Sequence, residues 1–72
     1  MAALLTTDVE QRAQVALSES PIYDLRHLHV DREGNTLLLS GRVATFYHKQ
    51  LAQEVVRAVA GGLHVVNSID VD

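Results

Sequence analysis

Four histidines are the residues in this chain whose type and spacing come nearest to chemistry. His27 and His29 stand two apart in a segment that alternates like a strand, so both should project from one face, with Asp31 next in line. A metal site needs three or four converging ligands, and His48 and His64 fall in other elements. We therefore expect no metal site, and we interpret the histidines as solvated or interface residues that could make a contact sensitive to pH.

The remaining polar residues do not form a catalytic pattern. None of the serines lies in a nucleophile elbow, and no carboxylate pair is fixed on one element. The chain has no cysteine, which excludes disulfides and thiolate catalysis. Gly61-Gly62 ends a helical pattern instead of preceding one, so it does not resemble a phosphate-binding loop. We expect a protein that is not an enzyme and that needs no cofactor.

Size and charge narrow the class of protein. The 72 residues are enough for one domain, 1–72, in which we expect residues 1–6 to be flexible. The net charge of -3 and the scattered basic residues argue against a nucleic-acid partner. No apolar run approaches the roughly 20 residues of a membrane-spanning helix. The first five residues lack the features of a signal peptide, which predicts a cytoplasmic location.

Two segments have the apolar spacing of amphipathic helices. The first begins at a capping box, Thr7 to Glu10, and ends before Pro21, because the residue that precedes a proline is pushed out of the helical region. The second covers about 45–60, with Thr45 as the N-cap and Gly61-Gly62 as the stop. The predicted buried faces comprise Val9, Ala13, Ala16 and Leu17 in the first helix, and Tyr47, Leu51, Val55, Ala58 and Val59 in the second.

Three segments alternate as strands do: 25–31, 36–43 and 65–71. The first two are joined by a short turn at Gly34 or Asn35 and should pair antiparallel. Gly41 lacks a side chain, so it should let a helix or a bulged backbone approach the sheet closely. The sequence leaves open whether the last strand lies beside the first or the second.

These elements predict an α+β fold in the order helix, strand, strand, helix, strand. Both helices need an apolar surface, so we expect a two-layer sandwich in which they cover one face of a three-stranded mixed sheet. The other face would carry a mixed apolar and polar surface for self-association or for a neighbouring domain. This candidate surface comprises Leu25, His27, His29, Leu38, Ser40, Arg42 and Val66.

Over nearly its whole length the chain resembles the BON domain, a small bacterial module named after osmotically inducible and nodulation-associated proteins. The resemblance rests on Leu28-His29-Val30, on the segment from Leu37 to Val43 with its Ser40-Gly41 pair, and on 61–71 with Val66-Asn67. It implies a non-enzymatic binding module, with phospholipid as a possible partner and roles in the cell envelope and osmotic stress. It also implies a periplasmic location if the chain is part of an exported protein. The alternative function is a small-ligand or ion-sensing domain, for potassium or another cation.

Overall fold

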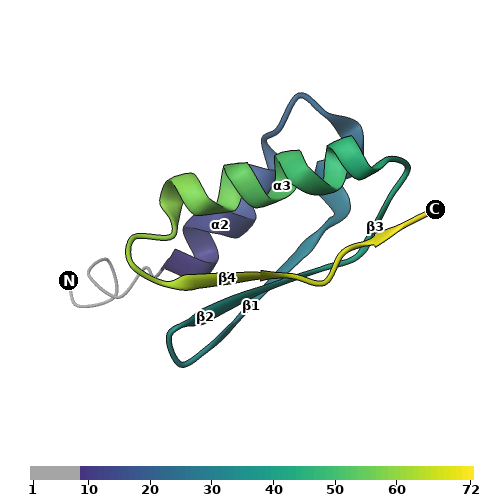
Figure 1. Ribbon diagram of the computed structural model, residues 1–72. Helices are drawn as coiled ribbons and strands as arrows, with labels where there is room; N and C mark the ends of the chain where they lie inside the picture. The colour runs from purple at the N-terminus through teal and green to yellow at the C-terminus, as the bar shows by residue number, and fades with distance from the viewer. Residues whose placement is uncertain (1–8) are drawn as a thin grey trace.

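The computed structural model describes residues 9–72 and places two helices on one side of a sheet (Figure 1). The first helix, α2 (Val9–Ser18), buries Ala13 and Leu17 fully, which confirms the predicted stripe. It ends before Pro21, also as predicted. The predicted capping residue, Thr7, lies outside the described residues.

The second helix, α3 (Phe46–Val59), begins and ends where the sequence predicts. The Thr45 hydroxyl accepts the His48 N–H at 3.0 Å, and Gly61 follows the helix at φ 68°. The predicted buried face was partly wrong, because Tyr47 and Ala58 are exposed. Its buried centre consists of Ala52 and Val56, with Leu51, Val55 and Val59 packed beside them.

The main sheet has the order β1-β2-β4, so the last part of the chain lies beside the second strand. β1 (His29–Glu33) pairs antiparallel with β2 (Thr36–Ser40) through a turn in which Gly34 has φ 60°. β4 (His64–Asn67) pairs parallel with β2. The mixed three-stranded sheet, the two helices and the element order confirm the predicted α+β fold.

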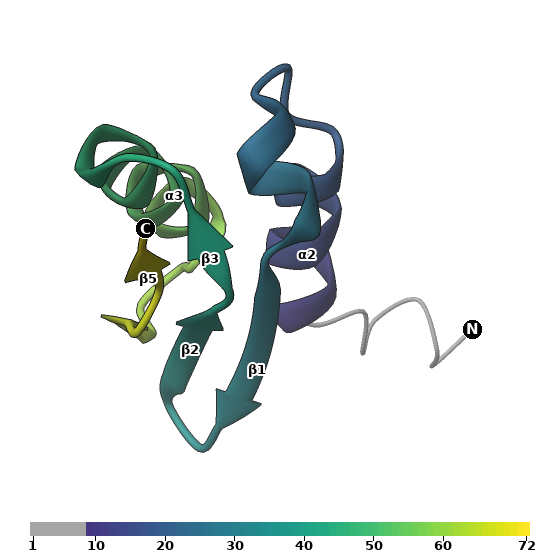
Figure 2. The same cartoon turned by 90° about the vertical axis from the view of Figure 1, so that its right-hand side faces the viewer.

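Gly41 interrupts the predicted second strand. Beyond it β3 (Arg42–Val43) pairs in parallel with β5 (Asp70–Val71) as a separate two-stranded sheet (Figure 2). Gly41 has φ 126°, and a Cβ there would lie 2.8 Å from Leu28 Cδ2. The predicted close approach is confirmed, although a leucine side chain makes it and not a helix or a bulged backbone.

The predicted first strand begins later than expected. Residues Tyr23–His27 form a short 3-10 helix, η1, and the strand starts only at His29. Leu25 and Leu28 are both buried, which fits three residues per turn better than strand alternation. Gln14 of α2 joins this region to the sheet, because its amide donates to the Leu28 carbonyl and accepts the Val30 N–H.

Candidate binding surfaces

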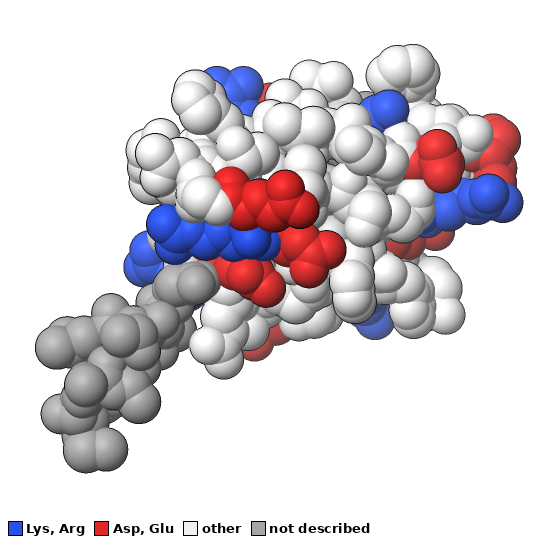
Figure 3. All heavy atoms as spheres, turned by 90° about the horizontal axis from the view of Figure 1, so that it is seen from below, with Lys and Arg blue, Asp and Glu red and all other residues white. Residues whose placement is uncertain are grey.

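The face of the sheet that the helices leave open presents a short apolar row. Strand pairing aligns Leu38 with Asp31 on one side and with Val66 on the other. Val66 is 43% exposed, and Leu38 is half-buried. Figure 3 views the molecule from this side and shows uncharged surface next to a group of acidic and basic side chains that lies across part of the face. We call Leu38 and Val66 the apolar row.

Two of the residues that sequence reasoning placed on this face, His29 and Ser40, do lie on its strands, and a third, Arg42, lies beyond them. His29 pairs with Ser40 across β1 and β2, and both are exposed. Arg42 is exposed as well, but it lies on β3 beyond Gly41. Its guanidinium is 3.4 Å from the Asp72 carboxylate, in an exposed ion pair of the kind that contributes little to stability.

Two of the predicted residues were placed wrongly. Leu25 is fully buried and belongs to the core, so it cannot line an open surface. His27 belongs to η1 and not to a strand, and its ring meets the Tyr23 ring edge-on at 4.8 Å between centroids. Both errors have one cause, since the alternation of the sequence was extended into a segment that forms a 3-10 turn.

Within residues 9–72 the histidines do not meet acidic side chains in the way a metal site requires. In the part of the chain that the structure describes, no group of three or more histidine, aspartate or glutamate side chains could hold a metal ion. His27 and His29 lie on different elements.

Every aromatic side chain of the chain is exposed at one end of the molecule. The chain has two tyrosines, one phenylalanine and no tryptophan. Tyr23 on η1 is 67% exposed, and Phe46 and Tyr47 in the first turn of α3 are 71% and 67% exposed. Aromatic side chains usually supply a large part of a small core. We call these three residues the aromatic end; sequence reasoning missed it by placing Tyr47 in or near the core.

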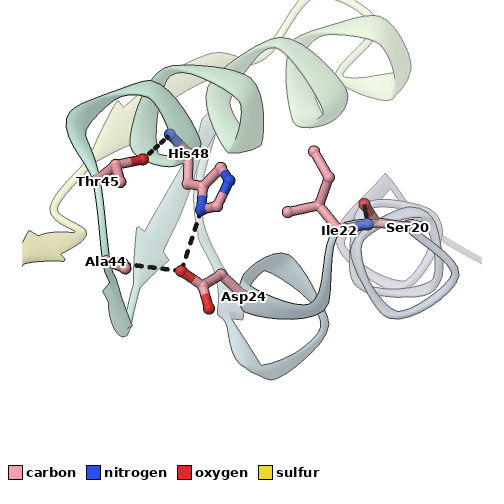
Figure 4. Close-up of polar contacts among 6 residues, drawn as sticks. All are labelled: Ser20, Ile22, Asp24, Ala44, Thr45 and His48. Carbon is pink, nitrogen blue, oxygen red and sulfur yellow. Dashed lines mark hydrogen bonds and ion pairs between the residues drawn. The ribbon is translucent and has the colours of Figure 1, made fainter.

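A polar contact fixes the two segments that carry the aromatic end (Figure 4). Asp24 Oδ2 accepts the Ala44 N–H at 2.8 Å and lies 3.1 Å from His48 Nδ1. The Ala44 hydrogen bond, followed by the contact with His48, lowers the pKa of Asp24. Asp24 follows Tyr23 directly, and His48 follows Phe46 and Tyr47, so this contact holds the aromatic residues in position relative to one another.

Two cationic side chains flank the aromatic end without a carboxylate partner among residues 9–72: Arg26 and Lys49. The Lys49 ammonium lies 5.7 Å from the centre of the Phe46 ring, within the range of a cation–π contact. Arg26 Nε donates to the Ser20 carbonyl at 2.7 Å. This end therefore combines exposed aromatic area with two cations, although the whole chain is acidic.

The helices are too short or too polar to span a bilayer. Among the residues that the structure describes, none forms a long apolar helix that could cross a membrane.

A comparison with protein families found one family whose model matches nearly the whole sequence. The BON domain model aligns with residues 6–72, which leaves only the first residues outside the match. A search of curated proteins found no matching sequence. The match spans both helices, η1 and all the strands described above. With this fold and this match, the chain belongs to the BON domain family.

Proposed function

We propose that this BON domain is a binding module that attaches to phospholipid bilayers through its aromatic end. BON domains are generally non-enzymatic binding modules. The observation that carries the proposal is the exposure of Tyr23, Phe46 and Tyr47 at one end of the molecule. Tyrosine and other aromatic rings favour the membrane–water interface, where the ring is apolar and the polar tip stays hydrated. Such attachment would agree with the role at the cell envelope in osmotic stress that the family resemblance implies.

Local charge supports the choice of an anionic bilayer. Arg26 and Lys49 flank the aromatic end, and Asp24, which follows Tyr23 in the chain, is already engaged by Ala44 and His48. Cations near a membrane surface contribute about 1 kcal/mol each toward anionic lipid. The net charge of -3 opposes the approach of the rest of the domain, which favours attachment by this end only. Binding should therefore weaken as salt screens the two cations.

Vesicle co-sedimentation tests the proposal. Full burial of an aromatic side chain stabilises by about 1.5–3 kcal/mol. Removing one partly buried ring should therefore weaken the partitioning of the domain onto vesicles about tenfold. We expect binding to vesicles with anionic lipid, reduced by salt and by Phe46→Ser. Val66→Ser is the matched control, since it removes an exposed apolar side chain from the open sheet face. Absence of binding at every lipid composition would refute the proposal, as would equal losses in the two variants.

Self-association through the open sheet face is a second candidate, favoured by the apolar row of Leu38 and Val66. The row is small, so it would supply only the centre of an interface with a second copy or with a neighbouring domain. Leu38→Glu places a charge in that centre. If the face self-associates, light scattering will give a mass above one protomer for the wild type and one protomer for the variant. One protomer in both proteins rejects this candidate.

A further inference from the structure

The turn between α3 and β4 forms a pocket of about 340 Å³, close to the lower end of the range for small-molecule sites. The α3–β4 turn lies at the opposite end of α3 from the first turn of this helix, which carries Phe46 and Tyr47 (Figure 1). The 14 residues of the helix separate the two by about 20 Å. Its polar lining includes Gln53, Arg57 and His64, together with the backbone of Gly61 and Gly62.

The pocket is basic although the chain is acidic. Arg57 lines it, and none of its lining residues is an aspartate or a glutamate. Arg57 has no carboxylate partner among residues 9–72. An arginine in the last turn of a helix also complements the helix dipole. That role does not require the glycine at position 62.

The backbone of the turn adds two hydrogen-bond donors. Neither the Gly61 N–H nor the Gly62 N–H donates to an acceptor within residues 9–72. Ala60 is in the right-handed helical conformation, at φ -72° and ψ -19°, and Gly61 follows at φ 68°. Successive residues of these two conformations form a concave arrangement of N–H groups that binds anions.

Gly62 has no structural reason to be glycine. Its φ lies outside the left-handed region, and a Cβ there would meet no atom within 4 Å. Gly61, by contrast, needs its positive φ. A side chain at 62 would occupy space at the pocket that the fold leaves free. Glycine at this position therefore keeps both the pocket and the backbone N–H accessible.

From these features we propose that the α3–β4 pocket binds the phosphate group of a small ligand. Arg57 supplies a guanidinium that can contact two oxygens at once, and the free N–H groups of Gly61 and Gly62 supply further donors. The phosphate could belong to a soluble molecule or to a lipid headgroup. The pocket and the aromatic end share no residue and lie at opposite ends of α3, so failure of one proposal does not decide the other.

The test is a titration of the isotope-labelled domain, followed by NMR, with inorganic phosphate and glycerol 3-phosphate against sodium chloride at equal ionic strength. We expect saturable shifts of the Gly61, Gly62 and His64 amide signals. Arg57→Gln and Gly62→Ala should each weaken binding about tenfold. Arg12→Gln on the exposed surface of α2 is the matched control and should leave binding unchanged.

A third arm separates the two sources of phosphate. Vesicles of phosphatidylglycerol are added to the wild type and to Gly62→Ala. If the variant loses affinity for vesicles, the ligand is a lipid headgroup; if it loses affinity only for the soluble phosphates, the ligand is a small molecule. The proposal is overturned if neither phosphate nor vesicles shift these signals beyond the chloride control. It is also overturned if Arg12→Gln weakens binding as much as Arg57→Gln.

Discussion

Replacement of Gly41 by alanine should come close to unfolding the domain. Gly41 has φ 126°, and an added Cβ would lie 2.8 Å from Leu28 Cδ2 and 3.4 Å from Leu28 Cα. Leu28 is 1% exposed and cannot move away without displacing its neighbours. The substitution therefore combines a backbone conformation that residues with a Cβ rarely adopt with a clash inside the core.

The two effects have known magnitudes. A positive φ costs a residue other than glycine about 1–2 kcal/mol, and overpacking a core costs about 1–3 kcal/mol. We therefore expect Gly41→Ala to lower the free energy of unfolding by about 2–5 kcal/mol. A core of this size rarely supplies more than about 3–5 kcal/mol in total. The variant should thus be largely unfolded, or only marginally stable, at room temperature.

Urea unfolding monitored by circular dichroism measures this effect. Gly34→Ala is the control, because Gly34 has φ 60° but a Cβ there would meet nothing within 4 Å. Gly34→Ala should lose only the free energy that a positive φ costs, about 1–2 kcal/mol. Equal losses in the two glycine variants would refute the clash.

Three further substitutions test other parts of the structure. Gly61→Ala should lower the free energy of unfolding by about 1 kcal/mol because Gly61 has a positive φ. Gly62→Ala should raise the free energy of unfolding by about 0.4–1 kcal/mol. The urea midpoints of the two variants should therefore move in opposite directions. Folding lowers the pKa of Asp24 below its ordinary 3.8. The Asp24 carboxylate therefore stabilises the fold above that pH and loses this contribution as the pH falls. The melting temperature of Asp24→Asn should decline less in acid than that of the wild type. An equal decline in the two proteins would contradict this role. Gln14→Ala removes both hydrogen bonds between α2 and the start of β1 and should lower the free energy of unfolding in urea by about 1–3 kcal/mol. An unchanged free energy of unfolding would show that water replaces these hydrogen bonds.

Local patterns were sufficient to predict most of the fold. Thr45 as the N-cap of α3, Gly61 as its stop and Gly34 in the hairpin each act through neighbouring atoms, so the sequence alone identifies them. The position of β4 beside β2 could not be predicted, because it depends on contacts between segments far apart in the chain.

The errors in the candidate surface have physical causes as well. Leu25 alternates with its neighbours like a strand residue, yet the Asp24 carboxylate binds the Ala44 N–H twenty residues away and helps to hold this segment as η1. Tyr47 falls on the helical period of Leu51 and Val55, but it lies in the first turn, where α3 extends past the buried core. Periodicity gives the direction of a side chain and not whether another element covers it.

Depth of insertion tests the bilayer attachment most directly. The chain has no tryptophan, so Phe46→Trp and Val66→Trp each create a single reporter, one at the aromatic end and one on the open sheet face. With vesicles of brominated anionic lipid, we predict a blue-shifted and quenched emission for Phe46→Trp and an unchanged emission for Val66→Trp. Quenching of Val66→Trp with none of Phe46→Trp would contradict attachment through the aromatic end.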